Sequence, residues 1–277
     1  MQYIEFHLYR VKFIRPQQLS ITFDDRSPSQ LFKDAIIEKP AFESDSRYKW
    51  HIGNNIEFDE FTGSFALGRT TTATLSKFDV VTRNFIEEQS EDSPYTFCIY
   101  DLRIGFVAIA KKSKLSPTVN GIARRLAKVL ENSLPAIKNE IRVLIDPISD
   151  PDGFIKKLQN SFSIKKFTAY FTGPNPFDAD ALFQKPISVY CKEANGSSGK
   201  VEVIGESLNE ETIIAVTHST AACGNEAIAK IIEKPGQAPK RIHLIGDPIK
   251  KSYRESECDF KKVAQDMKNE YSRVRNA

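Results

Sequence analysis

The segment best suited to acid–base chemistry is Thr217-His218-Ser219-Thr220. Residues 212–217 are rich in β-branched side chains and predict a buried strand, and strand ends often carry functional groups in α/β units. His218 could act there as the general base of a metal-dependent nuclease or phosphoesterase. Ser219 and Thr220 suit the cap of a following helix even better, which would make them structural. His218 is therefore a weak catalytic candidate.

The motifs that would complete such a site are missing from the sequence. A two-histidine phosphoesterase needs a second His-x-Ser/Thr, which His7, His51 and His243 do not supply. A metal-dependent nuclease needs paired acidic residues and a lysine on adjacent strands, and no predicted strand carries them. Lys200 ends a glycine-rich stretch, but Val201 follows where a phosphate loop has Ser or Thr, so a hairpin loop is predicted.

The cysteines do not suggest a metal site either. They are far apart and have no C-x-x-C spacing, which predicts reduced thiols rather than zinc ligands. They are Cys98, Cys191, Cys223 and Cys258. We therefore predict no metal and no cofactor.

A run of positive charge without any acid is the most informative feature. The formal net charge of the chain is only +3, yet residues 102–130 contain no Asp or Glu. Hydroxyl and amide side chains lie between the cations, and this mixture is what binding to a phosphate backbone requires. The cations of this run are Arg103, Lys111, Lys112, Lys114, Arg124, Arg125 and Lys128.

A second basic cluster lies nearer the C-terminus, and we predict that it forms another phosphate-contact surface. Either cluster can also be interpreted as a solvated face, or as a face for an acidic protein partner. Base-specific readout is not supported, because helix-turn-helix, zinc-finger and RNP-type motifs are absent from the sequence. The members of the second cluster are Lys240, Arg241, Lys250, Lys251 and Arg254.

The elements that would position these residues are mainly antiparallel strands in the first half of the chain. Ser116-Pro117 begins a predicted helix over residues 117–131, which carries an apolar stripe with the basic residues outside it. A short helix is expected over residues 29–38, and the acidic segment 83–93 is expected to be a loop or a short helix. Alternating patterns predict strands over residues 2–14, 47–59, 63–79, 95–101, 104–111 and 140–146.

The loop-like residues 146–153 predict a domain boundary, and the second half mixes helices and strands. Helices are expected to begin near Phe154, to cover residues 224–233 and to end the chain from Phe260 onward. The strands expected in this half cover residues 165–172, 187–192, 200–205, 212–217 and 241–245.

The predicted fold class is α+β. An antiparallel-sheet-rich domain over residues 1–150 would precede a mixed α/β domain over residues 151–277, and a length of 277 residues suits one or two domains. A hydrophobic content of 40% supports a folded core. The apolar runs are too short to cross a bilayer and the N-terminus does not read as a signal peptide, so we expect a cytoplasmic protein without membrane insertion.

In the order of its elements, the chain resembles the RexA-like phage-exclusion family and, more distantly, the DNA-binding subunit of the Kiwa anti-phage system. The resemblance covers roughly residues 1–172. It is carried by Phe6-His7-Leu8-Tyr9-Arg10, by Phe65-Ala66-Leu67-Gly68-Arg69-Thr70, by the hairpin over residues 95–108 and by Asp146-Pro147-Ile148. It implies a non-enzymatic, sequence-tolerant double-stranded DNA-binding protein that acts as a homodimer or higher oligomer in phage defence. The family has no motif that would assign contact residues.

Overall fold

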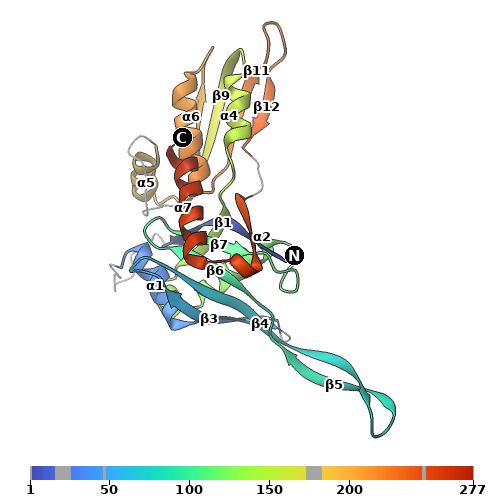
Figure 1. The fold of residues 1–277 in the computed structure, drawn as a ribbon. Helices are drawn as coiled ribbons and strands as arrows, with labels where there is room; N and C mark the ends of the chain where they lie inside the picture. Colours follow the sequence, from blue (N-terminus) through green and yellow to red (C-terminus); the bar gives the residue numbers. More distant parts are fainter. Residues whose placement is uncertain (1, 16–25, 46–47, 173–182, 245–247, 277) are drawn as a thin grey trace.

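The computed structural model describes residues 2–15, 26–45, 48–172, 183–244 and 248–276. The fold is α+β, as the sequence predicts, with antiparallel pairing between all the strands of both sheets. The two sheets stand one above the other in Figure 1, and a long helix runs beside both. Within the described residues, no helix is both long enough and apolar enough to span a bilayer.

The first sheet has the strand order β13-β1-β7-β6-β4-β3-β2, with β8 paired to β1 beyond β13 and β5 paired to β4. The expected strands at residues 2–14, 47–59, 63–79, 95–101, 104–111 and 140–146 are confirmed within a few residues. The strands are β1 (Tyr3–Ile14), β2 (Ala41–Asp45), β3 (Tyr48–Glu57), β4 (Thr62–Asp79), β5 (Asn84–Asp92), β6 (Tyr95–Asp101), β7 (Phe106–Ala110), β8 (Arg142–Pro147) and β13 (Lys250–Arg254).

Strand β1 is central because its alternating side chains enter two different cores. Tyr9, Val11 and Phe13 belong to one apolar cluster, whereas Phe6 and Leu8 belong to the other. Successive side chains of a strand point to opposite faces, so a strand buried on both faces supplies both cores.

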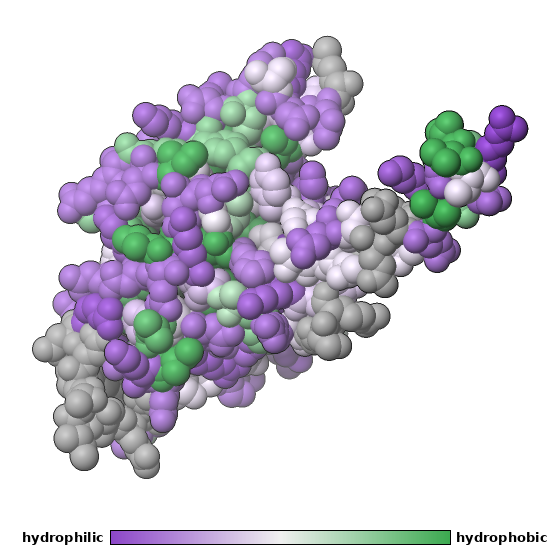
Figure 2. All heavy atoms as spheres, turned by 90° about the horizontal axis from the view of Figure 1, so that it is seen from below, coloured by the Kyte–Doolittle hydropathy of each residue, from purple (hydrophilic) through white to green (hydrophobic). Residues whose placement is uncertain are grey.

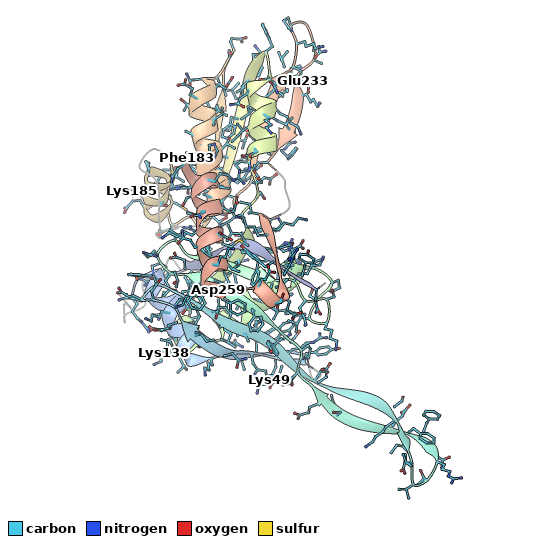
Figure 3. All side chains as sticks on the ribbon, in the orientation of Figure 1. Lys49, Lys138, Phe183, Lys185, Glu233 and Asp259 are labelled. Atoms are coloured by element: carbon cyan, nitrogen blue, oxygen red, sulfur yellow. The ribbon has the colours of Figure 1, made fainter. Side chains whose placement is uncertain are left out.

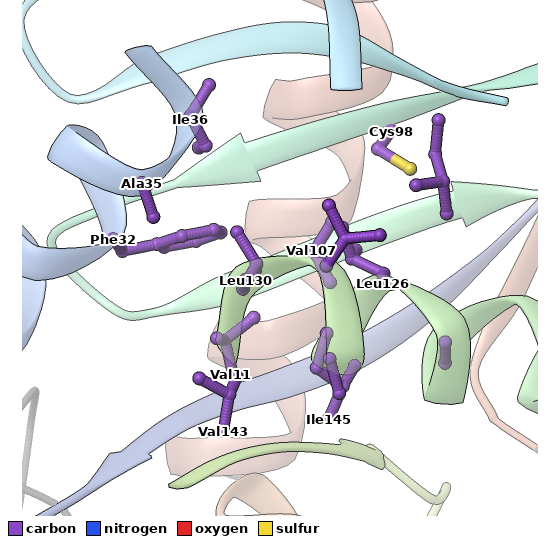
Figure 4. Packing of buried hydrophobic residues seen from close by; sticks show 14 of the residues in the cluster. Val11, Phe32, Ala35, Ile36, Cys98, Val107, Leu126, Leu130, Val143 and Ile145 are labelled. Atoms are coloured by element: carbon purple, nitrogen blue, oxygen red, sulfur yellow. The ribbon is translucent and has the colours of Figure 1, made fainter. Parts of the chain in front are cut away.

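Three helices cover the first of these faces. They are α1 (Pro28–Glu38), α2 (Val119–Glu131) and α3 (Leu134–Lys138). Ser27 and Gln30 form a capping box at the start of α1, and Thr118 caps α2 by accepting a hydrogen bond from the Gly121 N–H. Figure 4 shows Leu126 and Leu130 of α2 packed among Val107, Val143 and Ile145.

The second sheet has the order β10-β9-β11-β12, and α4 and α6 pack against each other beside it. Its strands are β9 (Ser163–Thr172), β10 (Ser198–Ile204), β11 (Ala227–Ile232) and β12 (Lys240–His243). The remaining helices are α4 (Asp152–Gln159), α5 (Gln184–Glu193), α6 (Glu210–Ala222), the short 3-10 turn Glu255–Glu257 and α7 (Phe260–Asn276). The predicted helix at Phe154, the strands near 165–172, 200–205 and 241–245 and the terminal helix are all confirmed.

The domain boundary expected near residue 150 stays a prediction. Two elements that follow it in the sequence, β13 and α7, pack on the first sheet. Strand β13 pairs with β1 of the first sheet. Helix α7 packs on β4 and β6 of that sheet and on α6 above it. Arg273 of α7 bonds to Asp150 at 2.7 Å and to Asp152 at 3.0 Å, next to the predicted boundary.

Four of the expected elements are wrong. Residues 212–217 lie in helix α6, because Asn209 caps a helix whose threonine hydroxyls bond to carbonyls one turn back. Residues 227–232 form strand β11 rather than a helix, since a strand between β9 and β12 can be apolar on both faces. Residues 187–192 lie in helix α5 instead of a hairpin strand.

The fourth error concerns the acidic segment 83–93, which is strand β5. Beyond Thr70, β4 leaves the sheet, and residues 71–79 pair only with residues 84–92 of β5. The Asp79 carboxylate closes the connecting turn by accepting hydrogen bonds from the Val81 N–H at 2.9 Å and the Thr82 hydroxyl at 2.7 Å. We call residues 71–92 the β-arm, and Figure 1 shows it projecting away from the body.

Candidate polyanion-binding cleft

Helix α2 has the two faces that its sequence predicts. Seven of its residues, among them Ile122, Leu126 and Leu130, are buried against the first sheet. Arg124 and Lys128 are exposed and Arg125 is half-buried. The helix begins at Val119 and not at residue 117, because Thr118 supplies the cap.

A cleft of about 790 Å³ follows this helix. One wall is α2, and the other walls are β8, the loop that precedes α2, the start of β3 and the middle of β4. Among the described residues, five cations line the cleft: Arg69, Arg124, Arg125, Lys128 and Arg142. Glu131 and Asp146 are the acids that line it in the part of the chain that the structure describes.

Both acids already have partners in the fold. Glu131 bonds to Lys128 at 2.7 Å and accepts a hydrogen bond from the Val143 N–H. Asp146 bonds to the buried Nζ of Lys12 at 2.9 Å, and Lys12 also donates to Asn225. The two carboxylates are therefore neutralised by lysines of the same chain.

The arginines of the cleft divide into two groups. Arg124, Arg125 and Arg142 make no ion pair with any described residue. Arg69 is engaged: its guanidinium lies 4.5 Å from the centre of the Tyr48 ring and donates to the Lys114 carbonyl at 2.9 Å. Three arginines without a carboxylate partner thus face one cleft, an arrangement suited to phosphate oxygens.

The other residues of the first predicted surface are placed differently. Lys112 and Lys114 are exposed in the loop that leads into the cleft, whereas Lys111 lies 4.0 Å from Glu5. Arg103 lies over the Phe61 ring, near the buried Asp101, and lines a separate hollow with Lys261 and Lys268 of α7. Arg103 is therefore not part of the cleft.

The second predicted surface is divided between two sheets. Lys240 and Arg241 lie on β12, where Lys240 pairs with Glu233 at 2.8 Å. Arg241 instead shares a hollow of about 310 Å³ with Lys166, Lys200 and Lys230. The remaining members lie on β13, and two of them are paired, Lys251 with Glu270 and Arg254 with Glu257, while Lys250 is exposed.

His218 does not lie at the end of a strand. It is buried in α6, and its Nδ1 lies 2.8 Å from the carbonyl oxygen of Val274 in the last turn of α7. This contact ties two packed helices together. The position gives His218 a structural role and does not favour the nuclease or phosphoesterase alternative.

Metal-ligating side chains are dispersed in the part of the chain that the structure describes. No three His, Cys, Asp or Glu side chains come together there as a metal site requires. The four cysteines are free thiols, and burial raises the pKa of Cys98, Cys191 and Cys258 above the ordinary range. Raised pKa values make these thiols poor nucleophiles.

Two residues of the cleft were missed by the charge pattern. Arg69 and Arg142 are single cations on predicted strands, far apart from each other and from Arg124 in the sequence. The fold brings them to α2, because β8 and β3 pack on this helix and Arg69 pairs with Trp50 of β3. The pairing of β8 with β1 is the feature that could have indicated Arg142, because it places β8 beside the helix.

Comparison with known proteins adds no assignment, since no family model and no curated protein matches the sequence. The resemblance of residues 1–172 to the RexA-like family stays a prediction.

Proposed function

We propose that the chain is a non-enzymatic protein that binds the phosphate backbone of double-stranded nucleic acid, most favourably DNA, along helix α2. The observation that carries this proposal is the set of three arginines, Arg124, Arg125 and Arg142, which face one cleft and have no carboxylate partner among the described residues. Cations placed in this way bind phosphates and release condensed counterions.

The side chains around the cleft favour a duplex over a single strand. Single-stranded nucleic acids bind by stacking their bases on exposed aromatic rings. Trp50 is 3% exposed, and the ring of Tyr48 is already covered by Arg69. The cleft therefore offers charge and no open aromatic platform, which fits a backbone whose bases are paired, and this mode of binding tolerates any sequence.

The test is fluorescence anisotropy of the purified protein with a labelled random-sequence duplex at several salt concentrations. Three cleft arginines with Lys112 and Lys114 would contact about three to five phosphates, so log affinity should fall against log salt with a slope of about −3 to −4.5. A single strand of equal length should bind more weakly. A duplex that does not bind at low salt would refute the proposal and would favour an acidic protein partner.

The role in phage exclusion that the resemblance implies is a separate proposal. It predicts that expression of the chain lowers the plating efficiency of sensitive phages. Loss of this protection when the cleft arginines are replaced would connect the role to the cleft. Full protection by such a variant would show that phage exclusion does not depend on the cleft.

A further inference from the structure

The tip of the β-arm exposes an unusual amount of apolar surface. Phe78 and Phe85 lie opposite each other with ring centres 5.2 Å apart. Val80 and Val81 in the turn are 78% and 92% exposed, and Phe85 is 81% exposed. Figure 2 shows these green side chains as a lobe set apart from the body. Exposed loop tips are normally polar, and an apolar patch of this kind marks a contact surface.

The shaft of the β-arm is acidic. Residues 71–92 contain five acids and two bases. Strand residues two apart share a face, so Glu87 and Glu91 lie on the same face as Phe85 and its partner Phe78. This face combines an aromatic pair with two exposed carboxylates.

Among the described residues, the two strands of the β-arm pair only with each other, and Figure 1 shows no helix lying on them. Its nine residue pairs extend about 30 Å from the sheet. A two-stranded ribbon by itself is marginally stable in water, so a surface that covers it is expected. The acidic shaft would repel phosphates, which argues against insertion into nucleic acid.

The complementary surface is present on the same chain. The cleft along α2 has three unpaired arginines for the carboxylates, and Pro117, Leu144 and Pro147 beside them give apolar contact. The β-arm projects away from the body, so its tip lies far from helix α2 of its own chain. We propose that the β-arm of one copy docks in the α2 cleft of a second copy, with the two arms exchanged.

The area fits a reciprocal exchange. An aromatic side chain presents about 150–250 Å², so one tip offers on the order of 500 Å² of apolar surface. Two tips and the surfaces that cover them would bury roughly 2,000 Å², which exceeds the 1,200 Å² or so of a stable interface. One arm on an unrelated protein would bury about half as much. The cleft would then hold either an arm or a polyanion.

The first test is sedimentation velocity without nucleic acid, so its result does not depend on the proposed function. Wild type should dimerise, more weakly as salt rises. The variant V81S/F85S should dissociate at least about tenfold more readily, since removing buried aromatic anchors has effects of this size. The control Tyr190→Ser alters a ring on α5 that is 72% exposed, and this variant should dimerise like wild type. A wild type that is monomeric at 100 μM, or a tip variant that dimerises normally, would overturn the proposal.

The second test exchanges the charges. A chain with Glu87→Lys and Glu91→Lys should not self-associate, and neither should a chain with Arg124→Glu and Arg125→Glu. A mixture of the two should form a heterodimer, because each arm then meets a cleft of opposite charge. Circular dichroism verifies that both chains fold. A mixture that stays monomeric would show that the arm does not occupy this cleft.

Discussion

Replacement of Arg124, Arg125 and Arg142 by Gln removes the three uncommitted cations of the cleft and leaves its paired groups in place. The three guanidinium groups lie at the surface of α2 and β8, so the change does not disturb the core. Each phosphate contact contributes about 0.9 to the slope of log affinity against log salt, so the slope should become less steep by about 2.7. At 0.1 M salt the same relation gives a loss of roughly 500-fold in affinity for duplex DNA.

The assay is fluorescence anisotropy from 50 to 300 mM salt, with the unfolding midpoint in urea as a check on folding. The matched control replaces Lys138, Lys156 and Lys185, which are exposed on α3, α4 and α5 and do not line the cleft. Figure 3 labels Lys138 and Lys185 well away from each other on the body. The control changes the net charge equally but should keep most of the slope. Equal losses in the two variants would refute the assignment to the cleft and leave only a general charge effect.

Three further predictions concern the stability of the fold. Leu126→Ala should destabilise the fold by about 3 to 5 kcal/mol, because Leu126 is fully buried on the inner face of α2, and a free energy of unfolding in urea within about 1 kcal/mol of wild type would contradict that packing. Gly63→Ala should cost about 1 to 3 kcal/mol, since an added Cβ would lie 2.6 Å from the Ile56 carbonyl oxygen, and the measurement is again urea unfolding. Burial alone would raise the pKa of Glu270, but Lys251 and Arg273 hold it below its ordinary value. The Glu270 carboxylate therefore stabilises the fold above the pKa of the unfolded chain and loses this contribution as the pH falls through the lower folded pKa. The difference in free energy of unfolding between wild type and Glu270→Gln should accordingly shrink as the pH falls from 7 to 3. A difference that stays constant would contradict the stabilising role of the Glu270 carboxylate.

The elements that the sequence predicted correctly have strong periodicity or clear boundaries. Helix α2 has an uninterrupted apolar stripe, and β1 and the β6–β7 hairpin alternate or end at clear turns. The errors fall where two structures share one pattern. The β-branched run in α6 suits a strand equally well, and its helical state depends on the cap at Asn209 and on packing against α7.

The site was only partly predictable, for a related reason. Charge density along the chain indicated α2, whose cations are close in sequence. Arg69 and Arg142 reach the cleft only through the pairing of distant strands, and Arg103 leaves it because its turn faces α7. Of the β-arm, the strand over residues 71–79 was predicted as part of 63–79, but β5 was missed. Acidic residues have low strand propensity, and β5 pairs only with the part of β4 that continues beyond the sheet.

The central claim is that the α2 cleft is where a polyanion binds, and hydrogen–deuterium exchange with and without a saturating duplex tests it most directly. Exchange should become slower in residues 112–131 and 142–147 and should not change in residues 163–172 or 260–276. Protection confined to the open face of the second sheet, around Lys166 and Arg241, would contradict it.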